Sequence, residues 1–115
     1  PKRGDVIAFR LNDNSSSSMH IKRIIGLPGE TILINEGQVV IDGEVYSEED
    51  MPAIENPGEA ETTITLAKNE YFVLGDNRNS SEDSRYTTIG MVLEDNIVGK
   101  IWFRTEPFSE IGLIR

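Results

Sequence analysis

A lysine and an arginine lie inside a short apolar run, and this run limits what the chain can fold into. Residues 21–30 read Ile-Lys-Arg-Ile-Ile-Gly-Leu-Pro-Gly-Glu. A short run rich in β-branched residues and closed by Gly and Pro predicts a buried strand, in which a charged side chain is costly. If residues 19–26 are extended, Lys22 and Arg23 point to opposite faces. The lysine shares its face with His20 and Ile24, and the arginine shares its face with Ile21 and Ile25. We therefore expect the two charges to have different roles.

Most of the remaining chain consists of short apolar runs separated by turn residues. These runs predict further strands at residues 6–9, 32–34, 39–41, 44–46, 62–66, 71–74 and 97–104. Asp42-Gly43 is a hairpin turn signal, and residues 93–96 predict a single helical turn. There is no repeat, no heptad and no long amphipathic helix. The sequence predicts a mainly β fold, in one domain that spans residues 1–115.

Three segments lack a strand pattern. Residues 12–18 are polar and predict a hairpin loop. Residues 47–61 are acidic, contain two prolines and have no hydrophobic period, so we expect an irregular surface loop or flap. The tail after Arg104 shows no clear pattern. In the strand before it, we expect Trp102 and Phe103 to contribute to the core rather than to touch a bilayer.

Composition argues against several classes of protein. The net charge of −9 argues against nucleic acid as a partner, because phosphate binding requires a basic face. Cysteine is absent, which excludes disulfides and thiolate metal sites, and His20 is the only histidine. We therefore expect no metal and no cofactor. No apolar run approaches the roughly 20 residues that a membrane helix needs.

A serine paired with a lysine base is the hydrolase chemistry that this composition leaves open. Nothing in the sequence places a serine and a carboxylate beside His20, and the 20 acidic residues make any carboxylate pair unspecific. A lysine base must be desolvated so that it is neutral near pH 7. Lys22 and Lys100 both lie in apolar strands, whereas Lys2 and Lys68 lie in polar surroundings. The pattern alone leaves Lys22 and Lys100 as rival candidates.

A dense polar run, residues 75–85, directly follows the predicted strand at 71–74. It contains two arginines and several carboxylates, and arginine pairs bidentately with carboxylates. Asp83 and Arg85 are two residues apart and can pair directly. We therefore expect a loop that bonds to itself.

Three segments, in order, resemble the type I signal peptidases. Residues 2–9 (Lys-Arg-Gly-Asp-Val-Ile-Ala-Phe) resemble that family's Arg-Gly-Asp strand. Residues 21–30 resemble its Lys-Arg-x-x-Gly-Leu-Pro-Gly-Asp box, with Glu30 in place of aspartate. Residues 71–85 resemble its Gly-Asp-Asn-Arg-x-x-Ser-x-Asp-Ser-Arg box. The short acidic middle is similar to the compact Gram-positive bacterial type. The resemblance implies a complex of antiparallel sheets.

The resemblance also implies a role for each residue of the site. Lys22 would be the general base of a Ser-Lys dyad, and Ser81 would orient its ammonium group. Asp83 and Arg85 would brace the site as an ion pair. The supporting residues would be Asp76, Asn77 and Arg78, which shape the loop, and Arg23, which is structural.

The implied activity is that of a membrane-bound serine endopeptidase. Such enzymes remove signal peptides from exported preproteins at the extracytoplasmic face of the bacterial cytoplasmic membrane. The family's nucleophile lies in a Ser-Met-x-Pro box before the Arg-Gly-Asp strand, and the present 115 residues contain no such box. Ser18-Met19 matches only the first two residues of that box. We expect the nucleophile segment and the N-terminal membrane anchor to be missing from this chain, and the chain alone to be inactive.

A second interpretation places the chain in the same family but without catalytic activity. In it the chain is a non-catalytic signal-peptidase-like protein that acts in the assembly of surface polymers such as pili, with pilin or another surface protein as its partner. Members of this kind are expected to have lost the serine or the lysine. Lys22 and Ser81 are both present, which favours the enzyme.

Overall fold

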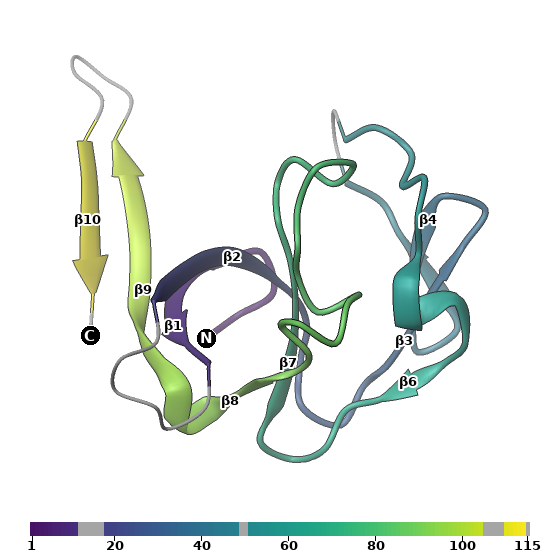
Figure 1. Cartoon of the computed structure of the whole chain (residues 1–115), viewed down its shortest axis with the longest axis horizontal. Coiled ribbons are helices and arrows are strands. Elements are labelled where there is room, and N and C mark those ends of the chain that lie inside the picture. Colours follow the sequence, from purple (N-terminus) through teal and green to yellow (C-terminus); the bar gives the residue numbers. More distant parts are fainter. Residues whose placement is uncertain (12–17, 49–50, 105–109, 115) are drawn as a thin grey trace.

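The fold is built from two antiparallel β-sheets (Figure 1). The computed structural model describes residues 1–11, 18–48, 51–104 and 110–114. The strands are β1 (Val6–Arg10), β2 (Met19–Gly26), β3 (Thr31–Asn35), β4 (Gln38–Ile41), β5 (Glu44–Tyr46), β6 (Ile64–Thr65), β7 (Glu70–Leu74), β8 (Val92–Leu93), β9 (Ile97–Arg104) and β10 (Glu110–Ile114). Two short 3₁₀ helices, η1 (Gly58–Glu61) and η2 (Glu94–Asn96), complete the described elements. The prediction of a mainly β fold is confirmed.

The larger sheet carries both candidate lysines. Its strand order is β10-β9-β1-β2-β7-β8, so β1 lies between β2 and β9. Ile7 of β1 pairs with Lys22 on one side and with Lys100 on the other. Residues directly opposite each other in antiparallel strands share a face. Lys22 and Lys100 therefore lie on one face of this sheet, separated by Ile7.

The smaller sheet is inserted in the sequence between β2 and β7, which pair with each other. Its order is β5-β4-β3-β6, and it lies at the opposite end of the molecule from the β9–β10 hairpin (Figure 1). Both of its two-residue hairpin turns have positive φ at each central residue: Glu36 and Gly37 at 52° and 79°, Asp42 and Gly43 at 49° and 84°. These values match the type I′ turn that follows the twist of paired strands.

The core is divided between the two faces of β2. Ile25 packs in a cluster with the smaller sheet and with Phe72 of β7. Ile24 packs on the other face with Ile7 and other buried residues. The predicted alternation of β2 is thus confirmed at its second half. The prediction of a buried strand is wrong for its first half, because Ile21 is 57% exposed there.

Gly26 lets the two sheets approach each other. A Cβ atom at this position would lie 2.6 Å from Ile32 Cδ1 and 2.9 Å from Leu66 Cδ1. Real Cβ atoms do not come this close to their neighbours, so a larger residue would push the smaller sheet away. The glycine of the apolar run therefore marks the contact between the sheets.

The structure corrects three of the predictions about elements. The tail does have a pattern, because β10 pairs with β9 from Glu110 opposite Arg104 to Ile114 opposite Lys100. The strand predicted at 62–66 is reduced to β6, and a further strand, β8, precedes the predicted helical turn. The acidic stretch 47–61 is irregular, but it is anchored, because Ile54 and Ala60 are buried in the core. Most of the predicted hairpin loop at 12–18 lies outside the described residues.

The aromatic residues of β9 are only partly described. Trp102 is half-buried, and the side chain of Phe103 lies outside the described part of the chain. The expectation that these residues serve the core rather than touch a bilayer therefore stays a prediction.

Candidate active site

Lys22 reaches the polar loop 75–85 through the pairing of β2 with β7. Arg23 pairs with Leu74, so Lys22 lies beside Gly75, the residue that begins the loop. A Cβ atom added to Gly75 would lie 2.2 Å from Ser81 Oγ and 3.4 Å from Lys22 Nζ. The Lys22 ammonium group and the Ser81 hydroxyl therefore both lie next to Gly75, which has no side chain to separate them. Lys22 itself is half-buried.

The Ser81 hydroxyl is oriented within the loop. It donates a short hydrogen bond to the backbone carbonyl of Asn77. A hydroxyl has one proton and two lone pairs, so a Ser81 Oγ that donates to Asn77 has only acceptor capacity left. An ammonium group has only donors to offer. The arrangement suits Ser81 as an uncharged acceptor for Lys22, and Asn77 takes part through its backbone rather than its exposed side chain.

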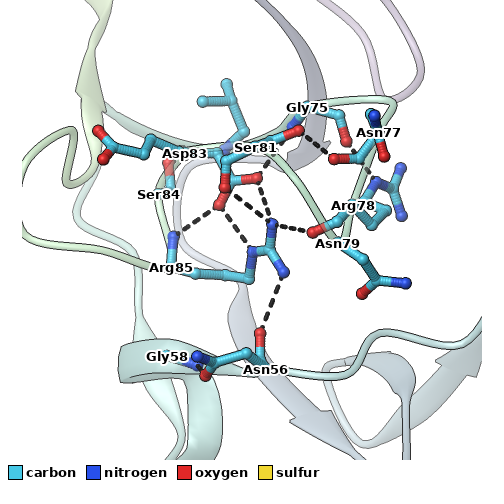
Figure 2. A network of polar contacts seen from close by, with 12 residues as sticks. Asn56, Gly58, Gly75, Asn77, Arg78, Asn79, Ser81, Asp83, Ser84 and Arg85 are labelled. Atoms are coloured by element: carbon cyan, nitrogen blue, oxygen red, sulfur yellow. Dashed lines mark hydrogen bonds and ion pairs between the residues drawn. The ribbon is translucent and has the colours of Figure 1, made fainter.

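Asp83 and Arg85 form a buried ion pair at the centre of the loop (Figure 2). Asp83 Oδ1 accepts from Arg85 Nε at 2.8 Å and Asp83 Oδ2 from Arg85 Nη2 at 2.9 Å. Asp83 Oδ2 also accepts from the backbone N–H of Gly75 at 3.0 Å. Neither side chain is more than 1% exposed. The predicted pair is therefore present, and it holds the first residue of the loop against the last.

Arg85 also ties the loop to the acidic stretch. Its Nη1 donates to the carbonyl of Asn56 at 3.0 Å (Figure 2). Its own carbonyl accepts from the N–H of Glu59 at 2.7 Å. Gly58 lies so close that a Cβ atom there would come within 2.3 Å of the Arg85 carbonyl oxygen. We call residues 51–61 the strap, because they run along the loop and are bonded to it. The sequence reasoning missed this role, since the acidic composition of these residues predicts only exposure.

Arg23 and Asp76 form a second, more exposed ion pair. Arg23 Nε and Nη2 each donate to one carboxylate oxygen of Asp76 at 2.9 Å. Arg23 Nη1 donates to the carbonyl of Gly4 at 2.8 Å. These hydrogen bonds hold the pKa of the Asp76 carboxyl below its usual range and raise the pKa of the Arg23 guanidinium. Arg23 thus joins β2 to the loop from the face opposite Lys22.

Arg78 is the third braced arginine, and its partner comes from outside the loop. Its guanidinium donates to both carboxylate oxygens of Glu48 at 2.7 and 2.8 Å. Its Nε donates to the carbonyl of Gly75 at 2.8 Å. The Arg78 side chain is 1% exposed, and that of Glu48 is 13% exposed. Sequence reasoning missed Glu48, because nothing distinguishes it from the other acidic residues around it.

Glu30 has a structural role in the turn after β2. Its carboxylate accepts from Arg3 at 2.6 and 3.0 Å and from the N–H of Leu27 at 2.7 Å. The bond to Glu30 raises the pKa of the Arg3 guanidinium. Glu30 stands where the family's box has aspartate, and its carboxylate bonds to both Arg3 and Leu27.

Ser84 is a further residue of the loop that sequence reasoning missed. Its Oγ accepts a hydrogen bond from the N–H of Val73 at 2.9 Å.

Lys100 has different surroundings from Lys22. Its side chain is 47% exposed, and its Nζ lies 3.7 Å from Asp5 Oδ1. The strand β1 lies between it and β2. The loop 75–85 follows β7, on the far side of β2, so Lys100 lies away from Ser81.

Two open features adjoin this site, one beside Ser81 and the other leading to Lys22. One is a cleft of about 680 Å³, bounded by Ser81, Gly58, Tyr86 and Thr88 among others. The other is an edge of β2: residues 19–22 pair with β1 on one side, while β7 pairs only from Arg23 onward. Within the described ranges, this edge has no strand partner.

Comparison with known proteins gives consistent matches to one family. The family model described as "Signal peptidase, peptidase S26" matches residues 1–105. The chain is 34% identical to the probable signal peptidase I-2 of Synechocystis sp., with 99% of the chain aligned, and 36% identical to the signal peptidase I T of Bacillus subtilis, with 96% aligned. The alignments cover 52% and 60% of those proteins, so the chain spans little more than half of their length.

A solved structure agrees with these matches. The crystal structure of a signal peptidase I from Enterococcus faecalis superposes with a TM-score of 0.70 at 34% identity. The superposition covers 89% of the present chain and 97% of that chain. The fold, the family model and the relatives therefore agree, and the chain belongs to the signal peptidase family, peptidase S26.

Proposed function

We propose that the protein is a serine endopeptidase that removes signal peptides from exported preproteins by a Ser-Lys dyad. The observation that carries this proposal is the meeting of Lys22 Nζ and Ser81 Oγ over Gly75, inside a loop braced by buried ion pairs. A lysine base needs partial burial and one fixed acceptor that adds no negative charge. Ser81 meets this requirement, because its proton is directed to Asn77.

In the proposed mechanism, Lys22 moves the protons. A serine from a segment outside the present 115 residues attacks the carbonyl carbon of the scissile peptide bond, and neutral Lys22 takes the hydroxyl proton. The amine leaves with a proton returned by Lys22, and an acyl-enzyme forms. Lys22 then takes a proton from water, which attacks the ester carbonyl, and Lys22 returns this proton to the serine oxygen as the peptide is released. Lys22 ends each cycle neutral.

The open edge of β2 supports an extended peptide as the substrate. A peptide can add to an unpaired strand edge through main-chain hydrogen bonds, with alternate side chains entering pockets. Met19 and Ile21 are 42% and 57% exposed beside this edge. The edge leads to Lys22, so the scissile bond of such a peptide would lie at the dyad.

We place the intact protein at the extracytoplasmic face of the bacterial cytoplasmic membrane, held by an N-terminal anchor. Preproteins that emerge from the membrane would meet the site there. Among the described residues, no helix has the length and apolar character to cross a bilayer.

The non-catalytic function in pilus assembly has less support. The relatives named above are all called signal peptidases, and none of these names points to surface polymers. Both Lys22 and Ser81 are present and adjacent. A pilin partner therefore has no observation in its favour.

Replacing Lys22 in the full-length protein tests the proposal. The reading frame that contains this chain is expressed with its upstream region, and cleavage of a preprotein is measured. We expect Lys22→Ala to lower the rate by at least ~10²–10⁴-fold, because it removes the general base. Ser81→Ala should lower it less, since the base remains but loses its orientation.

Matched variants serve as controls. Lys100→Ala removes the rival lysine, and Ser80→Ala removes the exposed hydroxyl next to Ser81; both should keep the wild-type rate. Thermal melting verifies that each variant is folded. Full activity in folded Lys22→Ala, or loss of activity in Lys100→Ala instead, would contradict the assignment.

A further inference from the structure

We propose that Glu48 is a positioning residue of the active site, acting through Arg78 on Gly75. This inference rests on the proposed function, and it adds a residue that the resembling motifs do not contain. Glu48 does not touch the dyad. It holds the arginine that fixes the glycine on which Lys22 and Ser81 meet.

The first link is the pair of Glu48 and Arg78. The two bonds of 2.7 and 2.8 Å join both carboxylate oxygens to two guanidinium nitrogens. Such a bidentate pair fixes direction as well as distance. Because the Arg78 side chain is 1% exposed, its charge has little access to water and depends on this carboxylate.

The second link joins Arg78 to Gly75. Arg78 Nε donates to the Gly75 carbonyl at 2.8 Å, and the Gly75 N–H donates to Asp83 at 3.0 Å. The two bonds hold Gly75 from both sides, one through each flanking peptide group. Removing Glu48 would leave a buried guanidinium unpaired, and Arg78 would then turn toward solvent and release the carbonyl.

The third link is the contact of Gly75 with the dyad. Ser81 Oγ and Lys22 Nζ lie 2.2 Å and 3.4 Å from the place where a Gly75 Cβ would be. With so little space, a small shift of this backbone changes the distance between hydroxyl and ammonium. Misplacement of a catalytic group by about 1 Å costs up to ~10²-fold in rate. Glu48 therefore acts on the rate of the chemical step rather than on substrate binding.

The test measures kcat and KM separately in the full-length enzyme. We expect Glu48→Gln to lower kcat by about 10- to 100-fold and to leave KM near the wild-type value. Arg78→Lys keeps the charge but removes the guanidinium group, which bonds to Gly75 and to Glu48 at once. It should therefore lower kcat to a similar extent. The double variant should lose about as much as either single variant, because both act through one chain of bonds.

Glu55→Gln is the matched control. Glu55 lies in the strap, is exposed, and contacts Asn79 through its backbone N–H. The substitution removes the same charge from the same region and should leave kcat unchanged. Unchanged kcat in Glu48→Gln, an equal loss in Glu55→Gln, or a rise in KM alone would overturn the inference.

A second readout separates this inference from the proposed function. In the 115-residue chain, Glu48→Gln should shift the amide NMR signals of Gly75 and Ser81 and speed hydrogen exchange at Gly75, and Glu55→Gln should not. If the wild-type enzyme fails to cleave preproteins, the proposed function fails, while these signals still decide whether Glu48 positions Gly75. If the Gly75 and Ser81 signals are unchanged in Glu48→Gln, the inference fails, whatever the activity of the enzyme is.

Discussion

At the scale of single residues, the site depends on the absence of a Cβ atom at Gly75. Gly75 leaves the space in which the Ser81 hydroxyl and the Lys22 ammonium approach each other. Its φ is not among the positive values of the chain, so alanine fits the backbone there and the obstacle is steric. The motif predicted Lys22 and Ser81 as partners, but it gave no reason for the glycine.

Gly75→Ala should therefore reduce activity without unfolding the protein. The new Cβ atom would lie 2.2 Å from Ser81 Oγ and 2.5 Å from Ser81 Cβ, so Ser81 must move away from Lys22. We expect kcat of the full-length enzyme to fall by about 10- to 100-fold. Gly43→Ala is the contrast, because this turn glycine has a φ of 84° and open space around it. It should lower the melting temperature and leave the kcat of the folded enzyme unchanged. Wild-type kcat in Gly75→Ala would contradict the steric argument.

At the scale of elements, the site is the place where two strands and two irregular segments are tied together. The strands themselves follow from short β-branched runs and turn signals, and these made most of the larger sheet predictable. The tie between the strap and the loop was not predictable. It consists mainly of backbone groups, such as the Asn56 carbonyl and the Glu59 N–H, which have no signature in the sequence. The strand β10 was missed because its sequence is short and contains a central glycine, Gly112.

The ion pair between β2 and the loop predicts a dependence of stability on pH. Arg23 lowers the pKa of the Asp76 carboxyl in the folded state, relative to an unfolded value of about 3.9. The stabilisation is therefore fully present above about pH 4 and is lost as pH falls through the folded pKa. Because Asp76 is 54% exposed, we expect it to be worth less than about 1 kcal/mol.

Urea unfolding between pH 6 and pH 3 measures this effect. The free energy of unfolding of Asp76→Asn should fall less on acidification than that of the wild-type chain. High salt should reduce the difference, since the pair is exposed to screening. Identical slopes in both proteins would show that the pair contributes nothing to the pH dependence.

At the scale of the whole molecule, the buried pair of Asp83 and Arg85 links the two sheets through the strap. Asp83 and Arg85 follow β7 of the larger sheet, and Arg85 bonds to the strap, which lies between β5 and β6 of the smaller one. The local patterns predicted both sets of strands, but they contain no information on this arrangement. The pairing of β2 with β7 joins segments that are distant in sequence, and hydrophobic alternation does not specify partners.

Asp83→Asn should destabilise the entire fold. It leaves the Arg85 guanidinium buried without its carboxylate, and breaking a buried pair in this way costs about 3–5 kcal/mol. This is a large part of the roughly 5–15 kcal/mol that stabilises a typical domain. Urea unfolding of the 115-residue chain measures the loss. Asp95→Asn changes an exposed carboxylate in η2 and should stay within about 0.5 kcal/mol of the wild type. A similarly small effect of Asp83→Asn would mean that the sheets hold together without the pair.

The insertion of the smaller sheet has a consequence for how the chain can change in length. The insert begins and ends at one point: the Gly29 N–H donates to the Leu66 carbonyl at 3.1 Å, and the Leu66 N–H donates to the Glu30 carbonyl at 2.8 Å. Its hairpin turns are held by further bonds: the Ile54 N–H donates to the Gly37 carbonyl at 3.0 Å, and the Asp42 N–H donates to the Thr31 carbonyl at 3.0 Å. The strap is bonded to the loop as well, which fixes its length. Residues added or removed at the β3–β4 turn, or between Ala53 and Glu59, would therefore shift the strap against the loop that carries Ser81.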